Sequence, residues 1–383
     1  MSGEGRPVIL FLNHWAAHLG GAELSLLDVI KETVRCGAHV HLLTSENGPL
    51  IQKASGVGAT CHVIPCSHNL GQVRRGNLVF SALKNLPSIF SFLAFTLRVH
   101  SVVNRLQPAI IHANVPKSHF LLILLNMLGY QGKKVFHMRE IFINGTLPFF
   151  LYSWFFPHSG KVLTISYAVQ ERLPLKMKTR SVVVHNGVLV SQISSLNIPK
   201  TDGVSFVYLG RIVPWKGCHI LIKAFVLLRR KHPDKKISLT LAGGSYYWDI
   251  SYRDHLEELI ETAGVQPFCS LRSHIDDIYS FLPRFHVFCT AALDEPFGRS
   301  VAEAAACALP VIAFNSGGIP EVVVNDSGLL VQGCNPESFA ESMEKFVLHP
   351  ELICRMGSAA HERVKQFFNS SMQIPRIVKE IFE

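Results

Sequence analysis

Short apolar runs alternate with helical stretches along this chain, and the alternation begins a second time near residue 205. The predicted strands of the first half are 8–13, 39–44, 59–64, 109–112, 134–137, 162–165 and 182–185. Those of the second half are 205–209, 238–242, 286–289, 311–314 and 328–331. Apolar strands separated by helices are typical of parallel sheets covered by helices on both faces. The pattern therefore predicts an α/β chain with two doubly wound, Rossmann-like domains.

The length of the chain agrees with two domains, because 383 residues exceed one ordinary hydrophobic core. The stretch 189–203 is polar and has no helical or strand period, as a linker would. We predict a first domain over 1–190, a linker over 191–203 and a second domain over 204–383.

Composition narrows the class of protein further. Hydrophobic residues make up 48% and charged residues 17%, which predicts a globular chain with large cores. No apolar run reaches the roughly 18 residues of a membrane span, and the apolar run at 8–12 predicts a first strand rather than a signal peptide. The 9 cysteines contain no C-x-x-C pair and predict reduced thiols in the cytoplasm. The 19 histidines show no metal-ligand spacing, so we expect no structural metal.

Charge is distributed unevenly along the chain. Residues 1–200 hold 19 Lys and Arg against 7 Asp and Glu, a balance of +12, whereas residues 201–383 hold 18 against 21, a balance of −3. A basic half beside a nearly neutral half predicts an anionic partner for the first half. From charge alone that partner is a nucleic acid or a phospholipid surface.

Two glutamates eight residues apart, Glu295 and Glu303, follow the predicted strand 286–289. The first lies in a strand-to-helix loop and the second about one turn inside an Ala-rich helix. Ligands of open parallel sheets bind at this edge, and a helix start suits a phosphate. Carboxylates need a different partner, and sugar hydroxyls fit them. The alternative is a pair of acids that only stabilise the helix start.

Two further loops carry related residues. The strand 205–209 runs into a tight loop with Arg211 and Lys216, and the strand 311–314 runs into Gly317 and Gly318, followed by Ile-Pro-Glu. Together the three loops resemble the nucleotide-sugar half of the retaining glycosyltransferases of family 4, which have the GT-B fold. The resemblance covers nearly the whole chain. It implies two Rossmann-like domains facing a cleft, with the acceptor on the first domain, the donor on the second, and a last helix, 369–383, that crosses back.

The resemblance also implies roles for single residues. Arg211 and Lys216 would pair with the donor diphosphate, Glu295 would contact hydroxyls of the transferred sugar, and Glu303 those of the ribose. His137, which ends the strand 134–137, matches the active-site histidine of the family. The predicted catalytic residues are therefore His137, Glu295, Arg211 and Lys216, and the predicted donor-binding residues are Gly20, Gly21, Arg211, Lys216, Glu295, Phe297, Gly298, Arg299 and Glu303. Cations and a helix start replace a divalent ion in such a site, so we expect neither a metal nor a cofactor.

The chain departs from the family pattern after Asn186-Gly187-Val188, where Leu189 replaces the usual aspartate. No residue with an assigned role is affected. Enzymes of this family retain the anomeric configuration without an obvious nucleophile. The resemblance therefore implies front-face displacement rather than a glycosidase pair of carboxylates.

Two apolar, aromatic segments lie in the basic half, at 86–98 and 147–157. Both are too short to cross a bilayer. Aromatic side chains beside cations suit shallow seating in an anionic membrane interface, whereas the alternative is ordinary core packing. Sequence leaves both interpretations open.

The resulting prediction is a metal-independent, retaining hexosyltransferase of the cytoplasm or the inner face of a membrane. Its partners would be a UDP- or GDP-sugar, a saccharide or lipid-linked acceptor and an anionic membrane surface, but not nucleic acid. The alternatives are another GT-B enzyme, such as a nucleotide-sugar epimerase, and a non-catalytic sugar- or nucleotide-binding protein. NAD chemistry is disfavoured because no G-x-G-x-x-G follows the first strand.

Overall fold

The computed structural model describes residues 6–17, 19–66, 86–157, 159–190, 203–244 and 250–383. The chain divides into two compact units. Unit 1 consists of Met1–Ile165, Val169–Val184 and Ile374–Glu383, and unit 2 of Ser166–Ala168 and His185–Gln373. The predicted linker, 191–203, lies outside the described residues except for its last residue.

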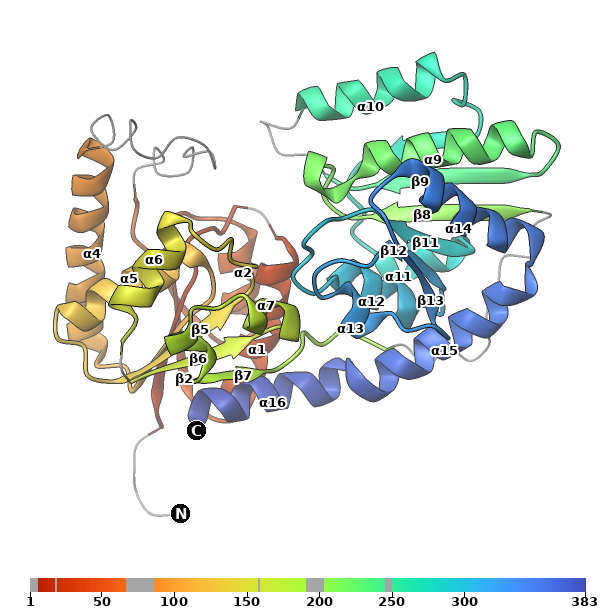
Figure 1. Ribbon diagram of the computed structural model, residues 1–383. Coiled ribbons are helices and arrows are strands. Elements are labelled where there is room, and N and C mark those ends of the chain that lie inside the picture. Colours follow the sequence, from red (N-terminus) through yellow and green to blue (C-terminus); the bar gives the residue numbers. More distant parts are fainter. Residues whose placement is uncertain (1–5, 18, 67–85, 158, 191–202, 245–249) are drawn as a thin grey trace. The chain divides into compact units, whose positions relative to one another are not determined.

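Unit 1 is built on a seven-stranded sheet in the order β3-β2-β1-β4-β5-β6-β7, and all its pairings are parallel (Figure 1). The order reverses between β1 and β4, and this reversal is where open α/β sheets bind ligands. The strands are β1 (Val8–Leu12), β2 (His39–Thr44), β3 (Thr60–Val63), β4 (Ile110–Ala113), β5 (Lys133–Met138), β6 (Gly160–Thr164) and β7 (Ser181–Val183).

Helices cover both faces of this sheet because alternate strand residues point to opposite sides. Ile9 and Phe11 of β1 pack with α1, α2 and the end of α16, whereas Leu12 lies against Phe95 of α4 and Leu121 of α5. The helices of the unit are α1 (Gly21–Arg35), α2 (Pro49–Gly56), α4 (Leu86–Leu106), α5 (Pro116–Met127), α6 (Leu147–Phe155), α8 (Leu175–Lys178) and the greater parts of α7 (Tyr167–Glu171) and α16 (Ser370–Phe382).

Unit 2 has a six-stranded parallel sheet in the order β10-β9-β8-β11-β12-β13. Its strands are β8 (Val204–Leu209), β9 (Ile237–Ala242), β10 (Cys269–Arg272), β11 (Val287–Thr290), β12 (Val311–Phe314) and β13 (Gly328–Val331). Its helices are η2 (Pro214–Lys216), α9 (Cys218–Lys231), α10 (Ile250–Thr262), α11 (Ile278–Phe281), η4 (Leu282–Arg284), α12 (Arg299–Ala306), α13 (Ile319–Val322), α14 (Pro336–Leu348) and α15 (Glu351–Phe367). Phe206 and Tyr208 of β8 are buried in a core with α9, α10 and α14.

Sequence periodicity missed the edge strand β10, because its four residues, Cys-Ser-Leu-Arg, are too few to show a period. The last helix, α16, begins in unit 2 and belongs to unit 1 from Ile374 onward. There Ile377, Val378 and Ile381 are buried beside α1 and α2, and Glu380 pairs with Lys161 at 2.7 Å.

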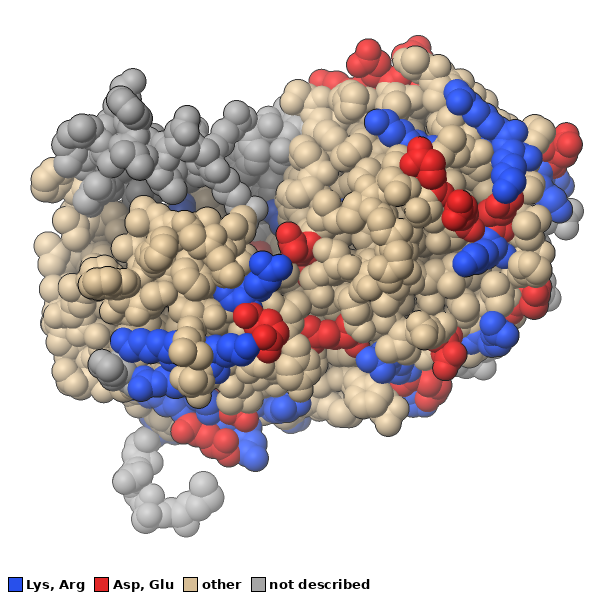
Figure 2. Space-filling model, in the orientation of Figure 1, with Lys and Arg blue, Asp and Glu red and all other residues tan. Residues whose placement is uncertain are grey.

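The aromatic segments of unit 1 are divided between core and surface. In α4, Phe95 and Val99 are buried, whereas Phe90 and Leu97 are exposed. Figure 2 shows that the area over α6 carries no charged side chains and is bordered on one side by Lys and Arg. Among the described residues, no helix has the length and apolar content needed to cross a membrane.

Candidate functional site

Three loops of unit 2 leave neighbouring strands at one edge of the sheet. They follow β8, β11 and β12, which are adjacent in the sheet order and parallel. Because the carboxyl ends of parallel strands meet at the same edge, the loops 210–217, 291–298 and 315–318 lie together. These are the loops that carry most of the predicted donor residues.

The first loop is braced against the second by a glycine. Gly217 has a left-handed φ of 72°, and a Cβ there would lie 2.3 Å from the carbonyl oxygen of Ala291. The amide of Leu293 donates a hydrogen bond of 3.3 Å to the carbonyl of Trp215. Only glycine therefore allows η2 to lie so close to the end of β11.

The third loop is held on the backbone of Glu295 by the glycine pair. Gly317 has φ 60°, and a Cβ there would lie 2.2 Å from the carbonyl oxygen of Glu295. The same oxygen accepts a hydrogen bond of 2.7 Å from the amide of Gly318. The two glycines thus fix the position from which the Glu295 side chain extends.

Two cations and a carboxylate gather around one indole ring. The ammonium of Lys216 forms an ion pair with Glu295, and both side chains are largely buried, with exposed fractions of 13% and 14%. Lys216 Nζ lies 4.4 Å and the Arg211 guanidinium 5.7 Å from the centre of the Trp215 ring. The structure therefore brings Arg211, Lys216 and Glu295 together at the ends of β8 and β11.

The start of α12 carries the remaining predicted donor residues of unit 2. Phe297 is buried, and Gly298 caps the helix with φ 87°. Arg299 Nε donates to Glu303 Oε1 at 2.8 Å, whereas Arg299 Nη1 is buried without a hydrogen-bond partner among the described residues. An unpartnered buried guanidinium N–H beside a helix start favours an anion, because the helix dipole and free amides act in the same direction.

Glu321 follows the glycine pair Gly317-Gly318, and its carboxylate is held by hydrogen bonds within unit 2. Its carboxylate accepts hydrogen bonds from the amides of Tyr167 and Ala168 and lies 2.7 Å from His185 Nε2. Burial acts to raise the pKa of Glu321, but the hydrogen bonds from His185 and the two amides bring that pKa below its usual value. This carboxylate stays ionised and holds the loop in place.

In unit 1, the glycines Gly20 and Gly21 stand at the start of α1. Gly20 is the N-cap, and its amide donates a hydrogen bond of 3.0 Å to Glu23 Oε2. A Cβ on Gly20 would lie 2.9 Å from that oxygen.

His137, the next-to-last residue of β5, lies in a buried polar network. Its Nδ1 lies 3.2 Å from His112 Nε2 and 3.4 Å from a terminal guanidinium nitrogen of Arg139. Arg139 Nε donates at 2.7 Å to Asn114, whose amide group donates at 3.0 Å to Asn13. The network joins two histidines within β4 and β5 to Asn13, Asn114 and Arg139, which follow β1, β4 and β5. Polar residues directly after apolar strands were the available sequence signal, but the prediction named only His137 as a site residue.

The network assigns the tautomer of His137. Burial, followed by the charge of Arg139, lowers the pKa of His137 well below its usual value, so the ring is neutral at pH 7. Arginine only donates, so Nδ1 of His137 accepts and the proton lies on Nε2. Among the described residues this Nε2 has no hydrogen-bond partner, although it is buried. His137 therefore presents one uncharged donor.

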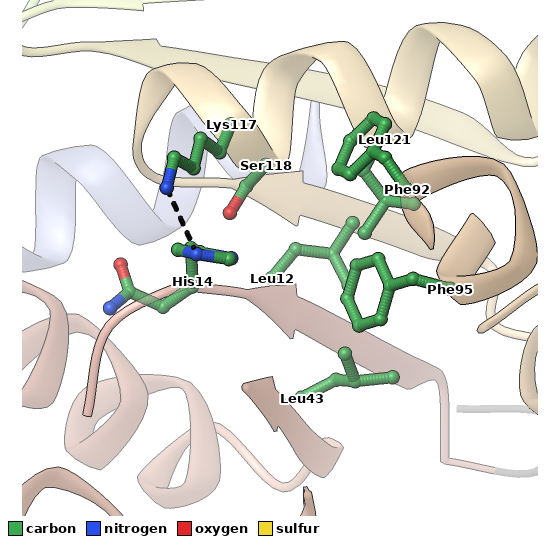
Figure 3. A pocket seen from close by; sticks show the side chains of 9 residues that line it. Leu12, His14, Leu43, Phe92, Phe95, Lys117, Ser118 and Leu121 are labelled. Carbon is green, nitrogen blue, oxygen red and sulfur yellow. Dashed lines mark hydrogen bonds between the residues drawn. The ribbon is translucent and has the colours of Figure 1, made fainter. Parts of the chain in front are cut away.

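A small cavity at the end of β1, on the side of α4 and α5, is lined by apolar side chains and by His14 and Lys117 (Figure 3). Lys117 Nζ lies 3.2 Å from His14 Nε2 and 4.5 Å from the centre of the Trp15 ring. Burial lowers the pKa of Lys117. The cavity, of about 10 Å³, has room for about one water molecule and none for a sugar.

Comparison with known proteins identifies the family. The model described as Glycosyltransferase Family 4 matches residues 19–192, and the model described as Glycosyl transferases group 1 matches residues 192–363. The chain belongs to glycosyltransferase family 4. The two matches together extend over residues 19–363, which include all the predicted site residues.

Individual relatives of this family 4 chain match it to different extents. A D-inositol 3-phosphate glycosyltransferase of Corynebacterium jeikeium is 30% identical over 45% of this chain and 42% of its own length. The chain thus spans less than half of that relative. The capsular polysaccharide biosynthesis glycosyltransferase CapM of Staphylococcus aureus is 25% identical over 87% of each chain.

Solved structures confirm the fold of the family 4 chain. Anabaena HepE, crystallised in complex with UDP and glucose, superposes with a TM-score of 0.79 over 98% of this chain and 99% of HepE, at 20% identity. The predicted α/β architecture with the GT-B fold is therefore confirmed.

Proposed function

We propose that this chain is a retaining, metal-independent glycosyltransferase that moves a hexosyl group from a UDP- or GDP-sugar to a hydroxyl of a membrane-borne acceptor. One observation carries the proposal, the convergence of Lys216, Glu295, Arg299 and Glu303 at the ends of β11 and η2 and the start of α12. The UDP and glucose bound to HepE, which has the same fold, are in keeping with this donor.

The proposed donor site divides its tasks among the loops. The diphosphate would meet Arg211, Lys216 and the unpartnered Nη1 of Arg299, together with the amides of residues 297–299 at the start of α12. A bound diphosphate would compete with Glu295 for Lys216 and release the carboxylate to hydroxyls of the sugar. Glu303 would bind the ribose hydroxyls.

Transfer in this proposal follows a front-face displacement. The bond from the anomeric carbon to the leaving phosphate oxygen breaks, the acceptor oxygen bonds to the same face, and the phosphate takes the acceptor proton. Arg211 and Lys216 stabilise the charge that develops on the phosphate. The Nε2–H of His137 donates to a hydroxyl of the transferred sugar, and its neutral ring adds no positive charge beside the anomeric carbon.

The acceptor part of the proposal rests on the basic first half of the chain and on the aromatic surface of unit 1. We infer a lipid-linked saccharide or glycolipid at the inner face of a membrane. The nine free thiols are in keeping with a reducing compartment.

The test is thermal unfolding in the presence of UDP, GDP, ADP or CMP, each with and without EDTA. A ligand at 100 times its dissociation constant adds about 2.7 kcal/mol to the free energy of unfolding, so UDP or GDP should raise the Tm, and EDTA should leave the shift unchanged. Lys216→Ala should abolish the shift, whereas Lys223→Ala on the exposed side of α9 should keep it.

The stereochemical part is tested separately, by NMR of the anomeric proton of the product formed from the nucleotide-sugar that binds. A product with inverted configuration would contradict retention. A Tm that no nucleotide changes would contradict the donor site itself.

A further inference from the structure

Helix α6 exposes a row of large apolar side chains. Leu147, Phe150 and Trp154 are spaced three and four residues apart, so they share one helix face, and their exposed fractions are 50%, 51% and 80%. Phe155 adds a fourth exposed side chain at 50%. The stretch 141–160 around them contains no Asp, Glu, Lys or Arg.

The opposite face of α6 is fixed in the core. Tyr152 is 1% exposed, and its hydroxyl lies 2.9 Å from Nδ1 of the buried His119. Phe156, directly after the helix, is also 1% exposed and packs against Phe136 of β5. The helix is therefore firmly seated, and its outer face is apolar although nothing in unit 1 covers it among the described residues.

Cations flank this face on the next elements of the chain. Helix α8 packs against α6 and presents Leu175, which is 76% exposed. The stretch 161–180 holds five Lys and Arg and one acid, Glu171, which pairs with Lys178 at 2.6 Å. Lys161 pairs with Glu380, and among the described residues no ion pair involves the other three cations, Arg172, Lys176 and Arg180.

Geometry links these cations to the apolar row. Arg180 donates a hydrogen bond of 3.4 Å to the carbonyl of Pro157, two residues after α6 ends. Figure 2 shows Lys and Arg side chains next to the uncharged area over α6. Exposed aromatic side chains with Lys and Arg beside them match the surface of an anionic membrane, where the acyl chains are apolar and the headgroups carry negative charge.

We propose that the α6–α8 surface, formed by Leu147, Phe150, Trp154, Phe155 and Leu175 with Arg172, Lys176 and Arg180, docks on a membrane that contains anionic lipid. The apolar side chains enter the boundary between headgroups and acyl chains, and the cations contact lipid phosphates. A membrane suits this surface better than a protein partner, because the exposed row is uncharged and three of the five cations beside it, Arg172, Lys176 and Arg180, form no ion pair among the described residues. This inference names the partner that the membrane-borne acceptor of the proposed function requires.

The test is binding of the full chain, without nucleotide, to phosphatidylcholine vesicles with and without 30% phosphatidylglycerol, by flotation. We expect binding to the anionic vesicles that weakens in 0.5 M NaCl, since salt screens the cations. Trp154→Ser with Phe150→Ser should weaken partitioning by about tenfold or more, and Arg172→Gln or Lys176→Gln by about fivefold each. Leu348→Ser on α14, equally exposed at 51%, is the control that should bind as the parent does.

Fluorescence places the contact on α6. Anionic vesicles should shift the tryptophan emission to the blue, and Trp154→Phe should remove that shift while it keeps vesicle binding. Equal binding by the Trp154→Ser, Phe150→Ser variant and the parent would overturn the proposal, as would a dimer in light scattering that the same variant converts to monomer. Nucleotide binding is measured without vesicles, so either proposal can fail while the other stands.

Discussion

The two units place their proposed site residues in contrasting environments. In unit 2, Lys216 and Glu295 pair across two loops braced by glycine, and Arg299 pairs with Glu303 within α12. In unit 1, His137 is a neutral ring in a buried network of histidine, asparagine and a single arginine. A cation that pairs with a carboxylate can release it and bind an anionic ligand instead. A neutral, buried N–H donor carries no charge to exchange, so its neighbours can act only on the direction in which it points.

The two units should also differ in how their stability depends on pH. Burial holds the pKa of His112 at about 3 and that of His119 at about 4, and it lowers the pKa of His137 well below its usual value. All three belong to unit 1. A folded pKa below the unfolded one means that the unfolded chain binds more protons as the pH falls below about 6.5.

The largest expected effect follows from these histidines. Between pH 6.5 and about 4, His112 and His119 each lower the free energy of unfolding of unit 1 by up to about 1.4 kcal/mol per pH unit, and His137 changes it in the same direction. Hydrogen exchange followed by mass spectrometry at pH 7 and pH 5, corrected for intrinsic rates, should show unit 1 peptides losing protection before unit 2 peptides. His119→Gln should reduce the slope, and earlier loss in unit 2 would contradict the assignment.

The charged pairs of unit 2 predict the next largest effect, on activity. Lys216→Ala should lower kcat by about 10²–10³-fold, roughly 3–4 kcal/mol, because it removes a cation from the developing phosphate charge. Lys223→Ala, which removes an exposed lysine of α9, should leave kcat unchanged. Steady-state kinetics with the nucleotide-sugar identified by thermal unfolding checks both. A kcat for Lys216→Ala within threefold of the parent would remove Lys216 from the proposed site.

The sequence predicted the sheets and the loops of unit 2 well, because both leave local signals. Strands β8, β11 and β12 are apolar runs, and Gly317 and Gly318 mark a loop that needs close backbone approach. The edge strand β10 was missed, because four residues are too few to show a strand period. The resemblance supplied the roles of Arg211 and Glu303, which stay predictions.

The network around His137 could not be predicted from periodicity, because its members come from three strands far apart in the chain. Asn13, Asn114 and Arg139 each follow an apolar strand, and only the order of β1, β4 and β5 brings them together. The sequence likewise could not show which side chains of α6 are exposed. Its sequence is apolar on all sides, so only the fold shows that Tyr152 faces inward and Trp154 outward.

A smaller effect is expected where glycine braces the unit 2 loops. Gly317→Ala should lower the free energy of unfolding by about 1 kcal/mol for its left-handed φ and by roughly 2 kcal/mol more for the overlap with the carbonyl of Glu295. Gly264→Ala, with φ 67° and no neighbouring atom within 4 Å, isolates the first contribution. Urea unfolding compares the two variants. Equal losses would mean that the loop moves freely and does not position Glu295.

The smallest effect concerns the orientation of the neutral donor in unit 1. Arg139→Met removes the N–H that faces Nδ1 of His137, so the proton should divide between Nδ1 and Nε2, and the pKa of His137 should rise because a nearby positive charge is lost. We expect kcat/KM to fall by about tenfold, the size of one misplaced hydrogen bond to a sugar hydroxyl. Long-range ¹H–¹⁵N NMR spectra of the imidazole should show the Nε2–H tautomer in the parent, a mixture in Arg139→Met and partial recovery in Arg139→Lys. A variant that keeps the Nε2–H tautomer while kcat/KM falls would show that Arg139 acts through packing. In that case His112, the other group within reach of Nδ1, would be what fixes the donor.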